Sequence, residues 1–265
     1  MNTTNAAHTK SSESSPRIAL ITGGSRGLGR SMALHLADHG VDSIITYHSN
    51  EAEAKAVVDA VIAKGRKSAA IRLDVGDSKS FSAFTESVRG ALAKHWQRDR
   101  FDFLVNNAGT GAYASFADTK ESDLDHMYAI HLKGPFLLTQ GLLPVIADGG
   151  RILNVSSGLT RFTMPGYAAY AAMKGGVEVL THYMAKELGA RKISVNTLAP
   201  GAIETDFGGG TVRDNAEVNK MIASQTALGR VGLPDDIGGA AALLLAPEAL
   251  WLNGQRIEFA GGIAL

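Results

Sequence analysis

A tyrosine and a lysine in the second half of the chain have the spacing of an acid/base pair. Tyr170 and Lys174 stand four residues apart in an alanine-rich stretch, so on a helix they share one face. A phenol ordinarily ionises near pH ~10, and an ammonium within ~4–6 Å favours the phenolate, so Lys174 is expected to lower the pKa of Tyr170. Ser157 follows the apolar run 152–155, where a strand could present its hydroxyl beside the phenol. The same spacing also occurs by chance on solvated helix faces, so its meaning depends on the motifs around it.

A glycine-rich turn follows the first apolar run of the chain. Residues 22–29 read Thr-Gly-Gly-Ser-Arg-Gly-Leu-Gly and lie between the apolar run 18–21 and a helical pattern. Glycines in such a turn let the backbone approach a pyrophosphate, and the helix N-terminus supplies unpaired N–H groups and a positive dipole end. The spacing G-x-x-x-G-x-G differs from the G-x-G-x-x-G fingerprint, and glycine-rich turns also occur without a ligand. The turn therefore indicates a dinucleotide site without establishing one.

Two further segments come directly after predicted strands. Asn-Asn-Ala-Gly at 106–109 follows the apolar run 103–105, and Pro-Gly-Ala-Ile-Glu-Thr at 200–205 follows a run that ends at 196. Small residues at the carboxyl end of a strand leave room for a ligand at the edge of an open sheet. Either segment alone could be a plain turn.

Apolar runs typical of strands alternate with helical patterns along the whole chain. This alternation predicts βαβ units, and right-handed crossovers then give a doubly wound parallel sheet of about seven strands with helices on both faces. We expect one Rossmann-type α/β domain over residues 17–265. Strands are predicted at 17–22, 42–47, 68–73, 101–105, 150–156, 192–198 and 255–259. Helices are predicted at 27–39, 50–64, 78–96, 121–147, 166–189, 214–226 and 234–246.

In their order and spacing, these four motifs resemble the short-chain dehydrogenase/reductase family. The resemblance covers about residues 17–265 and is strongest to the group around the 3-oxoacyl-carrier-protein reductases. It implies an oxidoreductase that transfers hydride between a nicotinamide and a ketone or secondary alcohol. It further implies that Tyr170 donates the proton, that Ser157 hydrogen-bonds the substrate oxygen, and that Lys174 lowers the phenol pKa and holds the ribose hydroxyls. A homo-oligomer, commonly a tetramer that pairs helices 121–147 and 166–189, is also implied.

The tip of the second predicted strand bears on the choice between NADP(H) and NAD(H). A carboxylate there commonly holds the ribose 2′-hydroxyl and selects NAD, but this strand ends in Tyr47-His48-Ser49-Asn50. Arg26 lies in the glycine turn, where relatives direct a basic residue at a 2′-phosphate, and a guanidinium pairs well with phosphate oxygens. The sequence therefore favours NADP(H), although Arg26 could also be a surface arginine.

The predicted cofactor-binding residues come from all of these segments. By resemblance Asp74 contacts the adenine, although it could also cap the next turn, and Ile203 and Thr205 meet the nicotinamide carboxamide. The complete set is Gly23, Ser25, Arg26, Gly27, Leu28, Gly29, His48, Ser49, Asn50, Asp74, Val75, Asn106, Ala108, Gly109, Tyr170, Lys174, Pro200, Gly201, Ile203 and Thr205.

One position departs from the family pattern. His131 stands where the family usually carries an asparagine that helps to hold a water that relays protons to the lysine. Neutral imidazole both donates and accepts hydrogen bonds, so His131 could take over that role, and activity should then fall as pH drops through its ordinary pKa of ~6.5. The alternative is a structural histidine satisfied within the core.

The expected substrate pocket is apolar. Its walls are predicted at 110–113, at 159–162 and from Phe207 onward, and the segment before Tyr170 contributes Phe162, Met164, Pro165 and Tyr167. These side chains favour an apolar or aromatic ketone. Three glycines at 208–210 give flexible backbone, so residues 206–226 are predicted to form a lid.

Composition narrows the remaining possibilities. The 265 residues have a formal net charge of zero and no cysteine, which excludes disulfides and thiolate chemistry and does not indicate a nucleic-acid partner. No metal site, membrane partner or secretory signal is predicted; residues 1–16 are interpreted as a disordered tail, and the expected location is the cytoplasm. Two alternatives stay open: a non-catalytic dinucleotide-binding redox sensor or scaffold, and a dehydratase or epimerase on the same scaffold.

Overall fold

A single parallel sheet organises the protein. The computed structural model describes residues 16–265 and contains seven strands in the order β3-β2-β1-β4-β5-β6-β7. The strands are β1 (Ile18–Ile21), β2 (Asp42–Tyr47), β3 (Ser68–Arg72), β4 (Phe101–Asn106), β5 (Ile146–Val155), β6 (Ser194–Pro200) and β7 (Arg256–Phe259). The predicted doubly wound α/β fold is confirmed. The predicted tail falls, apart from Pro16, outside the described residues.

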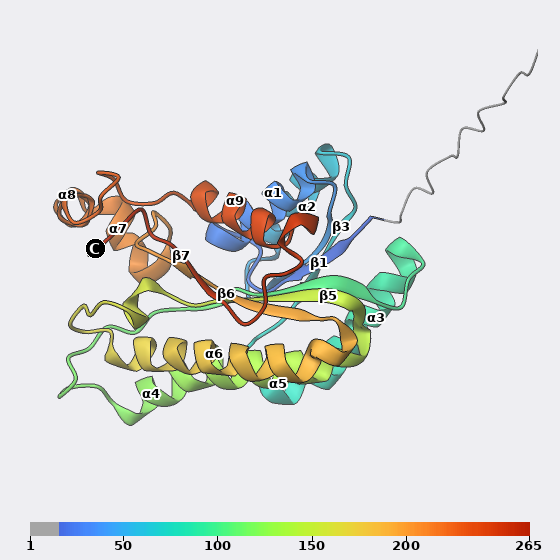
Figure 1. The fold of residues 1–265 in the computed structure, drawn as a ribbon, viewed down its shortest axis with the longest axis horizontal. Helices are drawn as coiled ribbons and strands as arrows, with labels where there is room; N and C mark the ends of the chain where they lie inside the picture. The colour runs from blue at the N-terminus through green and yellow to red at the C-terminus, as the bar shows by residue number, and fades with distance from the viewer. Residues whose placement is uncertain (1–15) are drawn as a thin grey trace, which may run out of the picture.

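Helices cover both faces of this sheet (Figure 1). One face carries α1 (Gly27–Asp38), α2 (Glu51–Ala63) and α9 (Pro234–Leu244). The other carries α3 (Phe81–Trp96), α5 (Gly134–Leu142) and α6 (Ala168–Glu187). The remaining α-helices within residues 16–265 are α4 (Glu121–Tyr128), α7 (Thr211–Asp214) and α8 (Ala216–Ser224).

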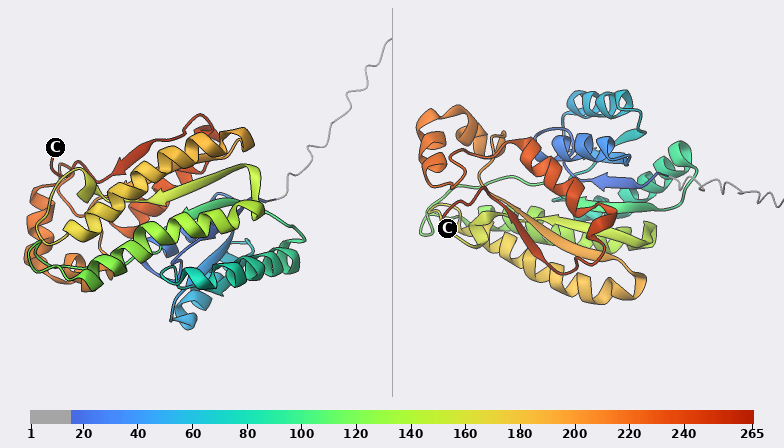
Figure 2. Two further views of the ribbon diagram at one scale, coloured as in Figure 1. Left: turned by 90° about the horizontal axis from the view of Figure 1, so that it is seen from below. Right: turned by 45° about the horizontal axis from the view of Figure 1, so that its top comes forward.

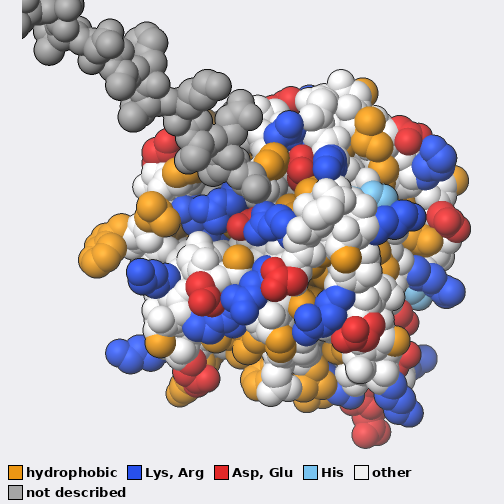
Figure 3. All heavy atoms as spheres, turned by 90° about the vertical axis from the view of Figure 1, so that its right-hand side faces the viewer, with side chains coloured by type: hydrophobic (Ala, Val, Ile, Leu, Met, Phe, Trp, Pro, Cys, Tyr) orange, Lys and Arg blue, Asp and Glu red, His pale blue; other side chains and the backbone are white. Residues whose placement is uncertain are grey.

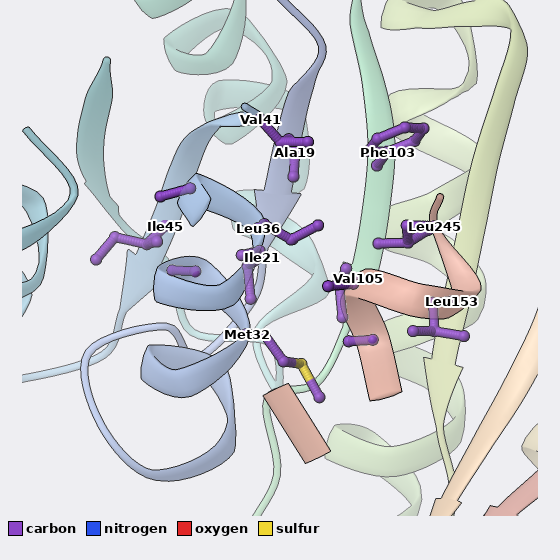
Figure 4. Packing of buried hydrophobic residues seen from close by; sticks show 14 of the residues in the cluster. Ala19, Ile21, Met32, Leu36, Val41, Ile45, Phe103, Val105, Leu153 and Leu245 are labelled. Atoms are coloured by element: carbon purple, nitrogen blue, oxygen red, sulfur yellow. The ribbon is translucent and has the colours of Figure 1, made fainter. Parts of the chain in front are cut away.

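Two apolar cores lie between the sheet and these helices. Successive side chains of a strand point to opposite faces, so Ala19 and Ile21 of β1 pack under α1 and α9 while Ile18 and Leu20 pack toward α3 and α5. Figure 4 shows the first core, in which Met32 and Leu36 of α1 meet the side chains of β1 and β4. Burial on both faces explains why the strands read as continuous apolar runs.

Two predicted helices have different boundaries in the structure. The helix expected over 121–147 is divided into α4, a π-helical turn (Ala129–Lys133) and α5, and β5 already begins at Ile146. Pro144 lacks the N–H that a continuing helix requires. The helix expected over 214–226 begins two residues later, because Asn215 caps α8 by accepting hydrogen bonds from the backbone N–H groups of Glu217 and Val218.

The strand order reverses between β1 and β4. The chain runs from β1 outward through β2 and β3, then crosses back to β4 and continues to β7. Ligands of such sheets bind in the crevice at the carboxyl ends of the strands at this switch point. The glycine turn and the other three motif segments all lie at this edge.

The opposite edge, where β1 begins, has a mixed charge. Figure 3 shows Lys and Arg side chains interleaved with Asp and Glu on this face. Several are paired: Arg17 and Arg98 both contact Asp102, and Arg191 contacts Asp148. Within residues 16–265, no helix has the length and apolar character needed to cross a membrane.

Candidate active site

Ser157, Tyr170 and Lys174 come together at the carboxyl end of β5. Ser157 precedes a short 3₁₀ turn (Gly158–Thr160), and α6 carries the other two residues on its buried face. The ammonium of Lys174 donates to the carbonyl of Val155 at 2.7 Å and lies 5.6 Å from the centroid of the Tyr170 ring. The Ser157 hydroxyl oxygen accepts the N–H of Leu159 at 3.2 Å, which leaves the hydroxyl hydrogen to be donated elsewhere.

Burial controls the ionisation of this cluster. It raises the pKa of the Tyr170 phenol above its ordinary value, although a hydrogen bond with Ser157 acts in the opposite direction. The expected lowering of the Tyr170 pKa by Lys174 is therefore wrong for the protein alone, because loss of hydration outweighs the other influences. Burial also lowers the pKa of Lys174 to about 8. At neutral pH the pair is a protonated phenol beside an ammonium.

His131 lies against this cluster from the π-helical turn. Its ring packs edge-on against Tyr170 with 5.0 Å between the centroids, and its Nε2 donates to the carbonyl of Thr110 at 2.6 Å. Since a carbonyl can only accept, Nδ1 is the unprotonated nitrogen, and it is buried without a hydrogen-bond partner among residues 16–265. Gly109 makes room for this ring, because a Cβ there would fall 2.7 Å from the imidazole Cε1.

The ionisation of His131 also differs from the sequence-based expectation. Burial, reinforced by the positive charge of Lys174, lowers the pKa of His131 to about 3. The imidazole is thus neutral throughout the range in which an enzyme is assayed. A loss of activity caused by protonation of His131 is therefore expected at a far lower pH than the ~6.5 of an ordinary imidazole.

The glycine turn is held in place by the Asn-Asn-Ala-Gly segment. Asn107 donates through its amide to the backbone carbonyls of Thr22 and Gly23 at 2.8 and 3.2 Å. The Thr22 hydroxyl in turn accepts the N–H groups of Asn107 and Ala108. Gly23 has a φ of 65°, and a Cβ there would lie 2.9 Å from the Cα of Ala108, so the close approach requires glycine. Sequence reasoning omitted Thr22 and Asn107, although both lie inside its motifs.

The start of α1 has the donor set that a phosphate needs. Within residues 16–265, the side chain of the N-cap residue Arg26 makes no hydrogen bond to the N–H groups at the start of this helix. The first turn of the helix also contains no acidic residue that would repel a phosphate. Arg26 itself lies 3.6 Å from Asp206, and the two side chains are largely exposed. Thr205 lies close to Gly27, whose Cβ would be 3.6 Å from the threonine methyl group. The residues present thus fit a dinucleotide bound across this turn.

The polar residues at the tips of β2 and β3 have local partners. His48 lies 3.6 Å from Asp74, and Asn50 caps α2 by accepting the N–H of Glu53. Asp74 also accepts the N–H of Gly76 at 2.8 Å, so the turn-capping alternative for this residue is confirmed. Arg72, which sequence reasoning did not single out, donates to the carbonyl of His48 and adds a cation here.

Asn106 differs from the other predicted cofactor residues. Its side chain is buried and donates to Thr139 at 3.1 Å and to Asn154 at 2.8 Å. The amide therefore belongs to a polar network inside the protein, behind β4 and β5. A cofactor could reach Asn106 only through its backbone.

A cavity of about 460 Å³ opens beside the cluster. Its lining includes Leu159, whose N–H contacts the Ser157 hydroxyl, and residues at the start of α6, but not Ser157 or Tyr170 themselves. The walls are mainly apolar or aromatic: Tyr113, Ser115, Phe116, Leu159, Thr163, Met164, Pro165, Gly166, Tyr167, Ala168 and Ala171. Phe116 was not predicted as a wall residue.

Two aromatic residues of the predicted pocket have other positions. Phe162 packs with Ile222 and Val231 in a small separate core, so its prediction as part of the cavity wall is wrong. Phe207 lies over the catalytic cluster, with its ring 5.4 Å from that of Tyr170.

Comparison with known proteins identifies the family. A sequence profile described as enoyl-(acyl carrier protein) reductase matches residues 23–264. The protein is a short-chain dehydrogenase/reductase. The reductase is therefore an NAD(P)-dependent oxidoreductase that acts on carbonyl and alcohol groups, which confirms the resemblance seen in the sequence.

Individual relatives cover nearly the whole reductase. A hydroxynaphthalene reductase-like protein, Arp2, of Metarhizium brunneum is 34% identical over 95% of this chain and 98% of its own. Among solved structures, the promiscuous reductase LugOII, which catalyses keto-reduction at C1 during lugdunomycin biosynthesis, has a TM-score of 0.89 and 35% identity over 94% and 98% of the two chains. The angucycline C-6 ketoreductase LanV with bound NADP has a TM-score of 0.88 and 32% identity over 93% and 95%.

Proposed function

We propose that this reductase uses NADPH to reduce a ketone on an aromatic or polycyclic skeleton. The observation that carries the proposal is the cavity between the serine turn and the start of α6, whose walls include Tyr113, Phe116 and Tyr167. Flat aromatic surfaces favour stacking and edge-on contacts with a flat aromatic substrate. Three relatives support the same substrate class: Arp2 is a hydroxynaphthalene reductase-like protein, LugOII catalyses a keto-reduction, and LanV is an angucycline ketoreductase.

Each residue of the cluster would have a defined task. When bound, NADPH supplies the hydride that adds to the carbonyl carbon. The phenol of Tyr170 gives its proton to the carbonyl oxygen, and Ser157 donates a hydrogen bond to that oxygen as negative charge develops. The ammonium of Lys174 holds the ribose hydroxyls and stabilises the phenolate that remains. The product is a secondary alcohol, and the reverse reaction uses the same groups.

The preference for NADPH would depend on the tips of the first two strands. Arg26 supplies a guanidinium for the 2′-phosphate, and β2 ends without a carboxylate that would repel it. His48 and Arg72 add positive or donating groups nearby. LanV, whose structure contains NADP, supports this choice.

His131 would hold a water through which a proton returns to the tyrosine by way of Lys174. Its Nδ1 is a buried acceptor without a partner, and the charge of Lys174 is close enough to affect its pKa. A water held between the two would satisfy both groups and link them. The neutral imidazole, with Nε2 committed to Thr110, is oriented for this task.

The test is to measure the rate of NADPH oxidation with each member of a panel of ketone substrates. We expect turnover of bicyclic and tricyclic aromatic ketones such as 1-tetralone, with a much higher kcat/KM than for aliphatic ketones or acetoacetyl thioesters. Tyr170→Phe should lower kcat by about 10²–10⁴-fold, far more than it weakens NADPH binding. A preference for the thioester would refute the proposed substrate class. A Phe variant with half of the wild-type kcat would refute the role of Tyr170.

A further inference from the structure

A charged side chain lies directly behind the serine turn. Glu178 follows Lys174 by one turn of α6 and is mostly buried. Its Oε1 accepts hydrogen bonds from the hydroxyls of Ser156 and Thr160, both at 2.7 Å. These two residues flank Ser157 and the turn that follows it, so one carboxylate oxygen joins both sides of the segment that presents the Ser157 hydroxyl.

Arg256 of β7 completes the support from the other side. Its Nε donates to the same oxygen of Glu178 at 2.8 Å, and its Nη2 reaches the backbone carbonyl of Ser157 at 3.3 Å and the hydroxyl of Thr160 at 3.2 Å. The Thr160 hydroxyl, which has one hydrogen to share, also lies 2.9 Å from the carbonyl of Ser157. A planar guanidinium holds several acceptors in one fixed geometry.

The network continues to the end of the chain. Arg256 donates through Nη1 to Glu258 at 2.8 Å, and Glu258 forms a two-pronged ion pair with Arg161. Arg161 then donates to the backbone carbonyls of Ile263 and Ala264. Two cations and two carboxylates thus connect α6, β7, the serine turn and the C-terminal segment, and their charges balance.

We propose that Glu178 and Arg256 are positioning residues that hold Ser157 within reach of the substrate oxygen. The inference rests on the proposed function, in which the Ser157 hydroxyl stabilises developing negative charge. Such a hydroxyl works only while its donor stays aimed at the reacting oxygen, and misplacement by about 1 Å can cost about 10²-fold in rate. Glu178 and Arg256 contact the backbone and hydroxyls around Ser157, and they act on the reaction through it.

A double-mutant cycle with Ser157→Ala tests this role. Glu178→Ala should lower kcat for the ketone about tenfold and leave the Kd for NADPH unchanged, measured by quenching of NADPH fluorescence. In the Ser157→Ala background the same substitution should lower kcat by less than about twofold, because residues that act through a shared group are not additive. Glu178→Gln keeps an acceptor at this position and should restore most of the loss.

Further variants keep the outcome decisive. Arg256→Lys retains the positive charge but loses the planar guanidinium, and we expect it to show the same pattern of kcat losses as Glu178→Ala. It therefore still tests the role of the network if Glu178→Ala folds poorly. Glu187→Ala, at the exposed end of the same helix, is the matched control and should leave kcat unchanged.

The positioning role is overturned by a full further loss of kcat in the Ser157→Ala background, or by an unchanged kcat in both Glu178→Ala and Arg256→Lys. If Ser157→Ala itself keeps wild-type kcat, Glu178 cannot act through Ser157 and the inference fails. In that case the kcat of Tyr170→Phe still tests the proposed ketone reduction independently of Glu178.

Discussion

At the scale of residues, burial determines the state of the catalytic cluster. Tyr170, Lys174 and His131 are each less than one-tenth exposed, and burial disfavours the charged form of all three. The phenol therefore stays protonated and the imidazole stays neutral at physiological pH. This is the state that a reduction requires, since the phenol must give up a proton.

The buried imidazole predicts an acid-sensitive fold. The unfolded chain protonates His131 below pH ~6.5, whereas the folded protein takes up this proton only near pH 3, so the free energy of unfolding should fall as pH drops through this window. The fall from this group between pH 7 and pH 5 is about 2 kcal/mol. His131→Asn should remove that part of the pH dependence and keep kcat at pH 7. Urea unfolding of both proteins at the two pH values measures it, and an equal fall in both would contradict the prediction.

Arg26 predicts the cofactor preference. Arg26→Ala should weaken NADPH binding by roughly 1.5–3 kcal/mol, about 10- to 150-fold in Kd, because a charge-assisted contact to the phosphate is lost. NADH, which lacks that phosphate, should be affected little. Asp206→Asn is the control: it removes the ion pair between Asp206 and Arg26 but keeps the guanidinium, so NADPH affinity should not fall. An equal loss for both cofactors would show that Arg26 does not recognise the phosphate.

At the scale of elements, the junction of β1 and α1 depends on close backbone packing. Gly29 lies in the first turn of α1, where a Cβ would collide with the carbonyl of Gly23 and lie 2.7 Å from the amide nitrogen of Asn107. The same amide clamps the glycine turn. The shape of the glycine turn therefore depends on the absence of a side chain at Gly29.

Two helical glycines should respond oppositely to the same substitution. Gly29→Ala should lower the free energy of unfolding by about 1–3 kcal/mol through overpacking and raise the Kd for NADPH. Gly90→Ala on α3, where a Cβ would meet nothing within 4 Å, should stabilise the protein by about 0.5–1 kcal/mol because alanine favours the helix. Denaturant titration and cofactor binding distinguish the two. A stable Gly29→Ala variant with normal affinity would show that the turn adapts.

At the scale of the whole molecule, one helical face has the character of an interface. In Figure 2, α4 and α5 follow one another along one line and lie beside α6 on one side of the protein. Along α6, Ala168, Ala172, Gly175, Val179 and Tyr183 follow one another at helical spacing. Val179 and Tyr183 are 56% and 65% exposed, and a Cβ on Gly175 would meet nothing within 4 Å. Such a stripe of small and apolar residues lets a second helix approach closely.

We therefore propose a homo-oligomer, of which a tetramer is the form the sequence predicts, with this face buried between copies. Val179→Glu should shift the protein to a smaller species in light scattering, because it places a charge in an apolar contact. Ile62→Glu on α2, at a similar exposure of 52%, is the control and should leave the mass unchanged. A wild-type protein that is monomeric at micromolar concentration would refute the assembly.

The order of the elements and the chemical types at the site could be predicted from the amino-acid sequence. Period and polarity are local properties, and in a sheet buried on both faces they predict apolar strands that alternate with helices. The spacing of Tyr170 and Lys174 already places them on one face of α6, and the glycine turn already predicts a phosphate site. These inferences required only backbone geometry and side-chain chemistry.

The surroundings of each of these groups depend on how the chain folds. Desolvation depends on neighbours that are distant in sequence, and it reversed the expected direction of the Tyr170 pKa and moved that of His131. Phe162 packs into a core whose other members lie beyond position 200, so nothing near it in sequence predicted its direction. Glu178 and Arg256 meet behind Ser157 because β7 pairs with β6 at the edge of the sheet. Contacts between distant segments arise from packing, and a local pattern does not contain them.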